Sequence, residues 1–327
     1  MKTRLLGKNG FKVGEIGMGC WQLGADWGPS IAEGTAFAIL AAAVENGVDF
    51  LDTANVYGNG RSETVIGRFM KETGKPVSVA TKFGRGPDVY PDNYSEDALR
   101  RSVDASRQRL GVETLALLQL HCVPIEILRQ GHIFDWLRRI KQENLIGHFG
   151  ASVETVEEGL LCLEQDDLLS LQVIFNIFRQ KLVGELLPRA EAQGVGIIVR
   201  LPLASGLLTG KFTGETTFPE TDHRHYNRDG QQFNVGETFA GLPLEKGVEL
   251  TDRLKPLLPD GMSMARMALR WILDHEAVSV IIPGASSPEQ AKSNTVVSDL
   301  KPLSGELHRT LSTFYAEHVH GHIRGPY

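Results

Sequence analysis

Apolar runs alternate with amphipathic stretches along almost the whole chain. Each run is short and continuously apolar, which is typical of a strand buried on both faces of a parallel sheet. Nearly every run is followed by a stretch with the apolar spacing of a helix. The pattern predicts eight strands, at Glu15–Cys20, Phe50–Asp52, Val77–Lys82, Leu115–His121, Ile146–Ser152, Leu171–Ile177, Gly196–Leu201 and Val278–Pro283.

Start and stop signals mark several of the helices between these strands. Ser95 precedes one of them and is followed by Glu96 and Asp97, so that a capping hydroxyl and two negative charges stand at its first turn. Gly111 ends the same helix. The expected helices lie at Thr35–Asn46, Ser62–Lys71, Ser95–Leu110, Ile133–Glu143, Thr155–Leu163, Gly184–Gln193, Leu244–Leu257, Met262–Asp274, Pro288–Val296 and Glu306–His320.

Eight strand–helix units in one chain favour a closed (β/α)8 barrel, the TIM barrel, over an open α/β sheet. The rival fold, a doubly wound sheet that binds a dinucleotide, needs a G-x-G-x-x-G turn after a strand. Gly17-Met18-Gly19 begins such a turn, but Cys20-Trp21-Gln22 follows it. We therefore expect one barrel domain spanning residues 1–327.

Three additions to a plain barrel are expected. Residues 1–13 read as a hairpin, with Thr3–Leu6 and Phe11–Val13 on either side of a turn. A long polar segment, roughly 213–241, interrupts the pattern after the seventh strand. It is expected either to cover cofactor and substrate as a lid or to be a surface loop without a function of its own. The last helix, Glu306–His320, extends the C-terminal end.

Composition narrows the classes of partner. The chain has 327 residues, 42% of them hydrophobic, and its formal charge of −6 comes without a basic run, which argues against nucleic acid. No apolar stretch is long enough to cross a bilayer, and the first residues lead into no signal-like region. Three separated cysteines, Cys20, Cys122 and Cys162, fit free thiols in a reducing compartment, so a cytoplasmic location is expected.

Polar residues close three neighbouring strands. Asp52 ends the second strand, Lys82 the third and His121 the fourth, while Tyr57 follows Asp52 on a turn-rich loop. The C-terminal ends of barrel strands meet at one rim, where enzymes of this fold carry their chemistry. We therefore expect these four side chains to meet. Each of these residues alone could also have a purely structural role, as a helix cap, a turn residue or a solvated strand end.

Together the four side chains suit the reduction of a carbonyl group. A phenol has an ordinary pKa of about 10, too high for efficient acid–base work near neutrality. Lys82 as a nearby cation would lower the pKa of Tyr57, and Asp52 would hold Lys82 in place. His121 would donate to, or orient, the carbonyl oxygen. A nicotinamide would supply the hydride, which no side chain can supply.

Aromatic residues lie on loops at the same rim. Trp21 and Trp27 follow the first strand, and Tyr90 follows the third. They are expected either to wall an aromatic substrate pocket or to serve in packing. Cys122, next to His121, is expected to border the pocket without being marked as reactive.

The motifs around these residues resemble one known family. The segment Val48–Gly58, continuing through Ser62–Gly67, resembles the first signature of the aldo-keto reductase family. Lys82 in Ala-Thr-Lys and His121 in Leu-Gln-Leu-His match two further motifs, and the resemblance covers essentially the whole chain. It implies reduction of aldehydes or ketones to alcohols with NADP(H), with a tyrosine as general acid. The implied catalytic tetrad is Asp52, Tyr57, Lys82 and His121.

The resemblance also implies which residues hold the nicotinamide. Ser152 matches the serine that binds the carboxamide in this family, and Gln172 matches the glutamine that shares it. Val153 stands where the family usually has asparagine. Arg200 stands where most members place an aromatic ring under the nicotinamide, and a guanidinium plane can stack there as well.

Two further segments resemble the family's sites for the rest of the cofactor. Val199–Lys211 resembles the pyrophosphate loop, and Ile282–Asn294 the adenosine-binding motif, a loop that opens a helix. Ser286 replaces the usual Lys or Arg at the 2′-phosphate, so NADP(H) is favoured by family habit and NAD(H) is the second choice. The implied cofactor contacts are Trp21, Asp52, Ser152, Gln172, Arg200, Leu201, Leu203, Ser205, Gly206, Lys211, Arg224, Gly284, Ser286, Gln290 and Asn294.

Two other functions are kept as alternatives. The first is a cofactor-binding redox sensor or regulatory subunit, like the potassium-channel β subunits that share this fold and retain the tetrad. The second is a metal-dependent barrel hydrolase, a more remote reading. The motifs His223-x-His225 and His318-x-His320-x-His322 lack the carboxylates or cysteines of a recognisable zinc site, so no metal is expected. The sequence leaves the carbonyl or alcohol substrate, the reaction direction and the oligomeric state open.

Overall fold

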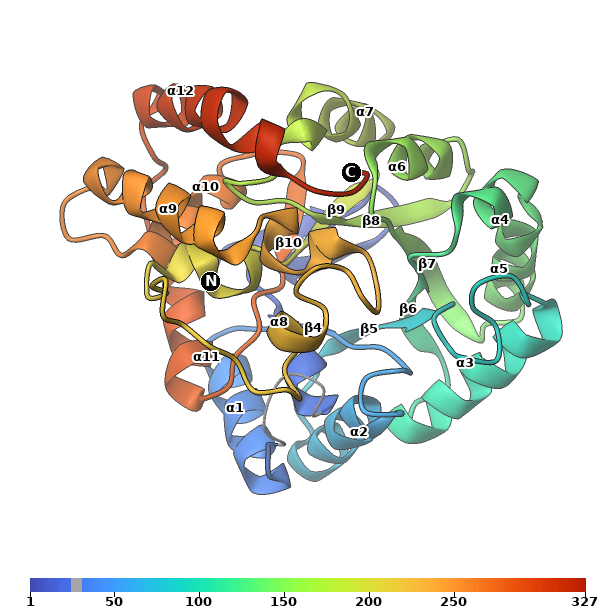
Figure 1. Cartoon of the computed structure of the whole chain (residues 1–327). Coiled ribbons are helices and arrows are strands. Elements are labelled where there is room, and N and C mark those ends of the chain that lie inside the picture. The colour runs from blue at the N-terminus through green and yellow to red at the C-terminus, as the bar shows by residue number, and fades with distance from the viewer. Residues whose placement is uncertain (25–30) are drawn as a thin grey trace.

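The computed structural model describes residues 1–24 and 31–327, so Trp27 lies outside the described residues. Its centre is one sheet of eight parallel strands in which each strand pairs with its neighbour along the chain (Figure 1). The strands are β3 (Met18–Gly19), β4 (Phe50–Asp52), β5 (Ser78–Phe83), β6 (Leu115–His121), β7 (Ile146–Ser152), β8 (Leu168–Ile174), β9 (Gly196–Arg200) and β10 (Val278–Ile281).

The two ends of the sheet meet, so it closes into a barrel. The amide of Ile281 donates to the carbonyl of Glu15 at 3.0 Å, and the amide of Gly17 donates to the carbonyl of Ile281 at 2.8 Å. A parallel bridge joins Ile16 to Ile281 between these bonds. The predicted (β/α)8 barrel is confirmed.

Helices form a ring around the barrel and pack their apolar faces against the strands (Figure 1). In α3 the hydroxyl of Ser95 accepts from the amide of Ala98 at 3.2 Å, and Gly111 ends the helix with a left-handed φ of 68°. The helices of the ring are α1 (Glu33–Glu45), α2 (Arg61–Thr73), α3 (Glu96–Leu110), α4 (Ile125–Gln130), α5 (His132–Gln142), α6 (Val156–Leu163), α7 (Leu186–Gln193), α9 (Leu244–Leu254), α10 (Met264–Leu273) and α11 (Pro288–Thr295).

Three elements differ from the expectation. Strand β8 begins at Leu168 rather than Leu171, because Asp167 takes a left-handed φ of 64° and the chain extends directly after this turn. Strand β3 is short, since only Met18 and Gly19 form a ladder with β4. The sequence pattern did not indicate α4, which lies in the connection between β6 and α5.

A hairpin covers the N-terminal end of the barrel, as predicted. Its strands β1 (Thr3–Leu6) and β2 (Phe11–Gly14) pair antiparallel. The guanidinium of Arg4 donates to Glu15 at 2.9 Å and to the carbonyl of Val278 at 2.7 Å, which fixes the hairpin to the first and last strands. The apolar cluster inside the barrel joins two hairpin residues to seven from the barrel: Leu6, Val13, Phe50, Ala80, Leu117, Leu169, Ile198, Val280 and Ile282.

The segment between β9 and α9 lies at the opposite end, over the C-terminal ends of the strands. It contains the short helix α8 (His223–Tyr226), which crosses in front of the strands in Figure 1. Outside the barrel, α12 (Gly305–Phe314) continues into one π-helical turn at Tyr315–Val319. The predicted long loop and additional C-terminal helix are therefore present. Within residues 1–24 and 31–327, no helix is long and apolar enough to cross a membrane.

Candidate active site

Three strand-end side chains and Tyr57, from the loop after β4, meet at the C-terminal end of the barrel. Lys82 Nζ donates to Asp52 Oδ1 at 2.5 Å and to the carbonyl of Thr53 at 2.7 Å, and it lies 3.3 Å from the hydroxyl of Tyr57. The rings of Tyr57 and His121 meet edge to face with centroids 5.9 Å apart. The sheet register explains the meeting, because β4, β5 and β6 are consecutive neighbours whose ends lie at one rim.

Asp52 is held by a complete set of donors. Its second oxygen, Oδ2, accepts from Gln119 Nε2 at 3.0 Å and from Gln172 Nε2 at 2.7 Å, while Lys82 occupies Oδ1. A buried carboxylate needs such partners to stay ionised. The sequence reasoning did not single out Gln119, although it lies two residues before His121 on one strand and therefore faces the same side.

The pKa of Tyr57 differs in direction from the expectation. Burial raises it above the ordinary value of 10.0, and the charge of Lys82, which acts in the opposite sense, does not outweigh burial. The phenol is therefore protonated throughout the neutral range. That state suits a group that gives a proton away.

The surroundings of Lys82 and His121 determine their protonation states at neutral pH. Burial alone would lower the pKa of Lys82, but Asp52 and Tyr57 together raise it above 10.5. The pKa of His121 lies well below 6.5, because burial and the positive charges of Arg85, Lys82 and Arg200 all disfavour the imidazolium. At neutral pH the site thus holds a charged lysine and a neutral histidine, which can donate a hydrogen bond but has no spare proton.

A cavity of about 1250 Å³ extends from these residues across the barrel mouth. Lys82 and Ser152 are buried and do not line this cavity. The hydroxyl of Ser152 donates to Gln172 Oε1 at 3.4 Å. Gln172 therefore connects Ser152 to Asp52. The wall includes the following residues anticipated from the sequence: Trp21, Asp52, Tyr57, His121, Gln172, Arg200, Leu201, Leu203, Ser205, Gly206, Lys211, Arg224, Gly284, Ser286, Gln290 and Asn294.

Two glycines line the far end of the cavity. At Gly206, where φ is 102°, a Cβ would be strained and would come within 2.7 Å of the Phe212 ring. At Gly284 a Cβ would come within 2.1 Å of the side-chain amide of Gln22, which would have to move aside. The long cavity and these glycine-lined walls fit an extended dinucleotide. The hydroxyl of Ser205 already has two partners, since it donates to the carbonyl of Glu237 and accepts from the amide of Phe239, so this residue would meet a cofactor through its backbone.

At the end of the cavity where adenosine is expected, some polar side chains already form hydrogen bonds or ion pairs within the protein. The amide and hydroxyl of Ser286 both donate to Gln290 Oε1, at 2.8 and 2.9 Å. Arg224 forms a two-point ion pair with Asp222 and lies over the ring of Phe218. Lys211 lines the same cavity, is exposed, and its ammonium forms no ion pair within the described part of the chain.

Aromatic rings wall the cavity beside the tyrosine. Trp21 stacks against Tyr57 with centroids 5.8 Å apart and meets the edge of Phe233 at 6.0 Å. Tyr90 also lines the cavity and is half exposed. Phe233 belongs to the segment after β9, so this segment closes over the site.

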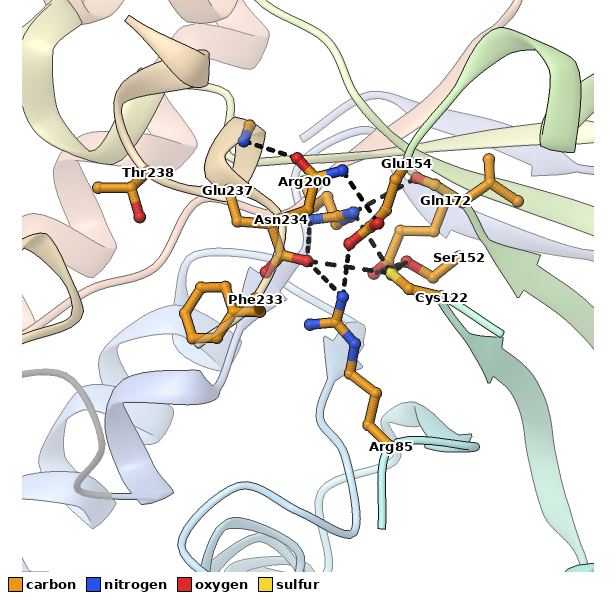
Figure 2. Close-up of polar contacts among 12 residues, drawn as sticks. Arg85, Cys122, Ser152, Glu154, Gln172, Arg200, Phe233, Asn234, Glu237 and Thr238 are labelled. Carbon is orange, nitrogen blue, oxygen red and sulfur yellow. Dashed lines mark hydrogen bonds and ion pairs between the residues drawn. The ribbon is translucent and has the colours of Figure 1, made fainter. Parts of the chain in front are cut away.

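A group of four charged residues, which we call the rim cluster, lies next to the tetrad (Figure 2). It consists of Arg85, Glu154, Arg200 and Glu237. Arg85 Nη2 lies 2.5 Å from Glu154 and 3.0 Å from Glu237, and Arg200 Nη1 lies 3.5 Å from the same Glu237 oxygen. The sequence reasoning named only Arg200 of this cluster. Arg85 follows the Lys82 strand end closely and Glu154 follows Ser152, but Glu237 stands in a polar segment without any pattern.

Cys122, Glu154 and Glu237 place a sulfur and two carboxylate oxygens within 4.8 Å of one another, as a metal site would require. Both carboxylates are already paired with arginines. Burial raises the pKa of the Cys122 thiol to about 12, although Arg85 and Arg200 oppose it, so the thiolate that binds metals is disfavoured. The arrangement therefore favours an ion-pair network. Within residues 1–24 and 31–327, neither histidine motif belongs to a group of this kind.

Comparison with known proteins gives full-length matches. The sequence model described as Aldo/keto reductase family matches residues 15–316. A protein of Arabidopsis thaliana named as a probable voltage-gated potassium channel subunit beta is 27% identical over 93% of this chain and 93% of its own length. The solved glycerol dehydrogenase of Gluconobacter oxydans is 27% identical, covers 99% of this chain and 98% of its own, and has a TM-score of 0.79. The holo form of an aldo-keto reductase from Bacillus halodurans is 25% identical, with 96% of both chains covered and a TM-score of 0.76.

Proposed function

The chain belongs to the Aldo/keto reductase family, an oxidoreductase family whose members use nicotinamide cofactors, and we propose that it reduces aldehydes or ketones to alcohols with NADP(H), Tyr57 acting as general acid. The observation that carries the proposal is the position of Lys82 Nζ, which bridges Asp52 Oδ1 and the hydroxyl of Tyr57 at the inner end of a long cavity. A small-molecule carbonyl compound is the substrate class that fits these groups.

Each side chain has a definite task in this proposal. A nicotinamide, when bound, would be the source of the hydride for the carbonyl carbon. Tyr57 gives its proton to the carbonyl oxygen, toward which the neutral imidazole of His121 donates a hydrogen bond. Lys82 stabilises the phenolate that is left behind. Asp52 positions Lys82 and balances its charge, so Asp52 acts through the lysine.

The cofactor contacts follow the cavity wall. Ser152 and Gln172 would hold the carboxamide, the latter through the oxygen Oε1, because its amide nitrogen is bound to Asp52. The backbone around Gly206 and Gly284 would approach the phosphates and the adenosine. Lys211 and Arg224 are the cations on this wall that would favour a 2′-phosphate, which supports NADP(H) over NAD(H).

Binding titrations test the proposal directly. NADPH and NADH are titrated separately against the protein, and the preferred one is then mixed with a panel of aldehydes and ketones while its oxidation is followed by absorbance. We expect tighter binding of NADPH and turnover of at least one carbonyl that is unaffected by a chelator. Failure of both cofactors to bind would overturn the proposal, and loss of activity with a chelator would point to a metal-dependent enzyme.

A second function is a cofactor-binding redox sensor or regulatory subunit. The potassium-channel β-subunit relative from Arabidopsis thaliana favours it, since its match covers 93% of both chains. Tight cofactor binding without oxidation of the cofactor by any carbonyl would support this second function. Turnover would support the enzyme.

A further inference from the structure

Arg200 is held by hydrogen bonds at the cavity wall rather than free in the cavity. Its Nη2 donates to the carbonyl of Val153 at 3.3 Å and to Cys122 Sγ at 3.5 Å. Cys122 Sγ in turn lies 3.8 Å from the hydroxyl of Ser152. The Nε of Arg200 is buried and has no hydrogen-bond partner in the described part of the chain.

Glu237 gives this arginine a permanent negative partner. One carboxylate oxygen of Glu237 faces both Arg200, at 3.5 Å, and Arg85, at 3.0 Å. Burial alone would raise the pKa of Glu237, but the two guanidinium groups lower it to about 2. Figure 2 shows the carboxylate between the two arginines. Glu237 is therefore ionised at neutral pH and faces Arg200 as a carboxylate.

Glu154 is the second carboxylate of the rim cluster and has a different protonation behaviour. It pairs with Arg85 at 2.5 Å and accepts from Asn234 Nδ2 at 3.0 Å. Burial and the neighbouring charge of Glu237 nevertheless raise its pKa to about 7. With Glu154 neutral, the rim cluster carries two positive charges and one negative charge; with Glu154 ionised, it carries no net charge.

We propose that Glu237 and Glu154, acting through Arg200, set the relative affinity of the site for the oxidised and the reduced cofactor. The inference rests on the proposed function, because it requires that a nicotinamide binds beside Arg200. The oxidised ring carries a positive charge that the reduced ring lacks. A bare guanidinium would repel the oxidised ring, whereas a guanidinium balanced by carboxylates accepts both forms. Glu237 and Glu154 are positioning and specificity residues in this account, since neither needs to touch the reacting atoms.

Replacing Glu237 by glutamine tests the charge directly. Glu237→Gln keeps the shape of the side chain and removes the negative charge that faces Arg200. Equilibrium titrations with oxidised and reduced cofactor at about pH 8.5, where Glu154 is ionised whether or not Glu237 is charged, give two dissociation constants for each variant. We expect the oxidised-to-reduced ratio of these constants to rise by about tenfold, the order expected for one charge a few ångströms away in a partly buried site.

Glu245→Gln is the matched control, because Glu245 also pairs with an arginine, Arg228, but lies on the exposed face of α9. Its ratio should equal that of the wild type. If Glu237→Gln leaves the ratio unchanged, or weakens both forms equally, the inference is wrong and Glu237 only shapes the loop. If neither form binds the wild type, the proposed function fails first and the inference fails with it.

The wild-type protein offers a second test that needs no variant to fold. Between about pH 6 and pH 8 Glu154 loses its proton, since its pKa is about 7, and the rim cluster gains a negative charge. The oxidised-to-reduced ratio should therefore fall as the pH rises, because the oxidised ring becomes better accommodated. The phosphates of the cofactor are the same in both forms and cancel in the ratio.

The groups that face Glu154 do not titrate in this window. Nearby carboxylates raise the pKa values of Arg85 and Arg200 above their ordinary range, while the pKa of Glu237 is about 2 and that of Cys122 about 12. Arg179, which donates to the backbone carbonyl of Glu154 at 3.0 Å, has a pKa of about 10. Glu154→Gln should make the ratio independent of pH. A ratio that is already flat in the wild type, or a slope that survives in Glu154→Gln, would contradict the inference.

Discussion

At the scale of single residues, the site depends on a buried charge pair. Asp52 and Lys82 are 3% and 1% exposed, and the carboxylate of Asp52 accepts from the side chains of Lys82, Gln119 and Gln172 on other barrel strands. Removing one partner of a buried pair leaves the other charge without compensation in a medium that solvates it poorly. The pair therefore stabilises the fold as well as the site.

Asp52→Asn should lower the free energy of unfolding by about 3–5 kcal/mol, because Lys82 then stays buried without a counter-charge. Urea unfolding followed by circular dichroism measures the loss. Asp104→Asn is the control, since Asp104 forms an exposed ion pair with Arg107 on α3 and should change stability little. Equal losses of unfolding free energy in the two variants would show that the buried pair stabilises the protein no more than an exposed one.

The sequence was sufficient to predict the positions of the four tetrad residues but not their energetics. Asp52, Lys82 and His121 each end an apolar strand, and strand ends in a barrel share one rim, so their meeting follows from topology. The direction of the Tyr57 pKa shift depends on how tightly the ring is packed, which is not visible in a linear sequence. Glu237 could not be anticipated either, because it stands in a polar segment with no periodicity.

At the scale of elements, the side-chain amide of one buried asparagine holds the segment between β9 and α9 in shape. Asn227 is fully buried; its Oδ1 accepts from the backbone amides of Gln232 and Phe233 at 2.9 Å, and its Nδ2 donates to Thr238 at 3.1 Å. Phe233 lines the cavity. The expected lid is thus an ordered loop whose shape is tied to the wall of the site.

Asn227→Ala should loosen this loop without unfolding the barrel. Three hydrogen bonds, each worth about 1 kcal/mol, are lost at once, so the cofactor should dissociate about tenfold faster and proteolysis within the loop should become faster. Stopped-flow displacement and limited proteolysis measure the two effects. Asn93→Ala, at an exposed turn, is the control. Unchanged dissociation in Asn227→Ala would mean that the loop does not retain the cofactor.

Most elements could be predicted from their periodicity, and the misses have local causes. Strand β8 starts earlier than expected because the turn at Asp167 ends directly before Leu168. Helix α4 is short and lies just after a strand, so it lacks the length needed for a helical pattern. Boundaries of this kind are decided by backbone conformation at single residues.

At the scale of the whole molecule, the barrel is sealed at one end and open at the other. The hairpin places Leu6 in the interior cluster, while the opposite end holds the cavity and the tetrad. The outer apolar core draws on residues from Ile16 to Val319, which leads us to propose that the chain forms one domain. Closure itself rests on backbone bonds such as that from Gly17 to Ile281, which no hydrophobic pattern reveals.

Leu6→Ala should lower the free energy of unfolding by about 2–5 kcal/mol, because it leaves a cavity inside the barrel. Turnover of the folded protein should be unchanged, since Leu6 lies at the end opposite the tetrad. Leu5→Ala on the same strand is the matched control, because Leu5 is 49% exposed. Urea unfolding of both variants checks the difference. Similar stabilities would show that the hairpin does not contribute to the interior core.

In the proposed reaction Tyr57 delivers a proton to a carbonyl group that takes its hydride from a nicotinamide. The most direct measurement is the single-turnover oxidation of bound NADPH by an aldehyde in the wild type and in Tyr57→Phe. Phenylalanine keeps the ring that stacks on Trp21 but lacks the hydroxyl 3.3 Å from Lys82 Nζ. We expect a rate about 10²–10⁴-fold lower with an unchanged dissociation constant for NADPH. A rate close to that of the wild type would show that Tyr57 is not the proton donor.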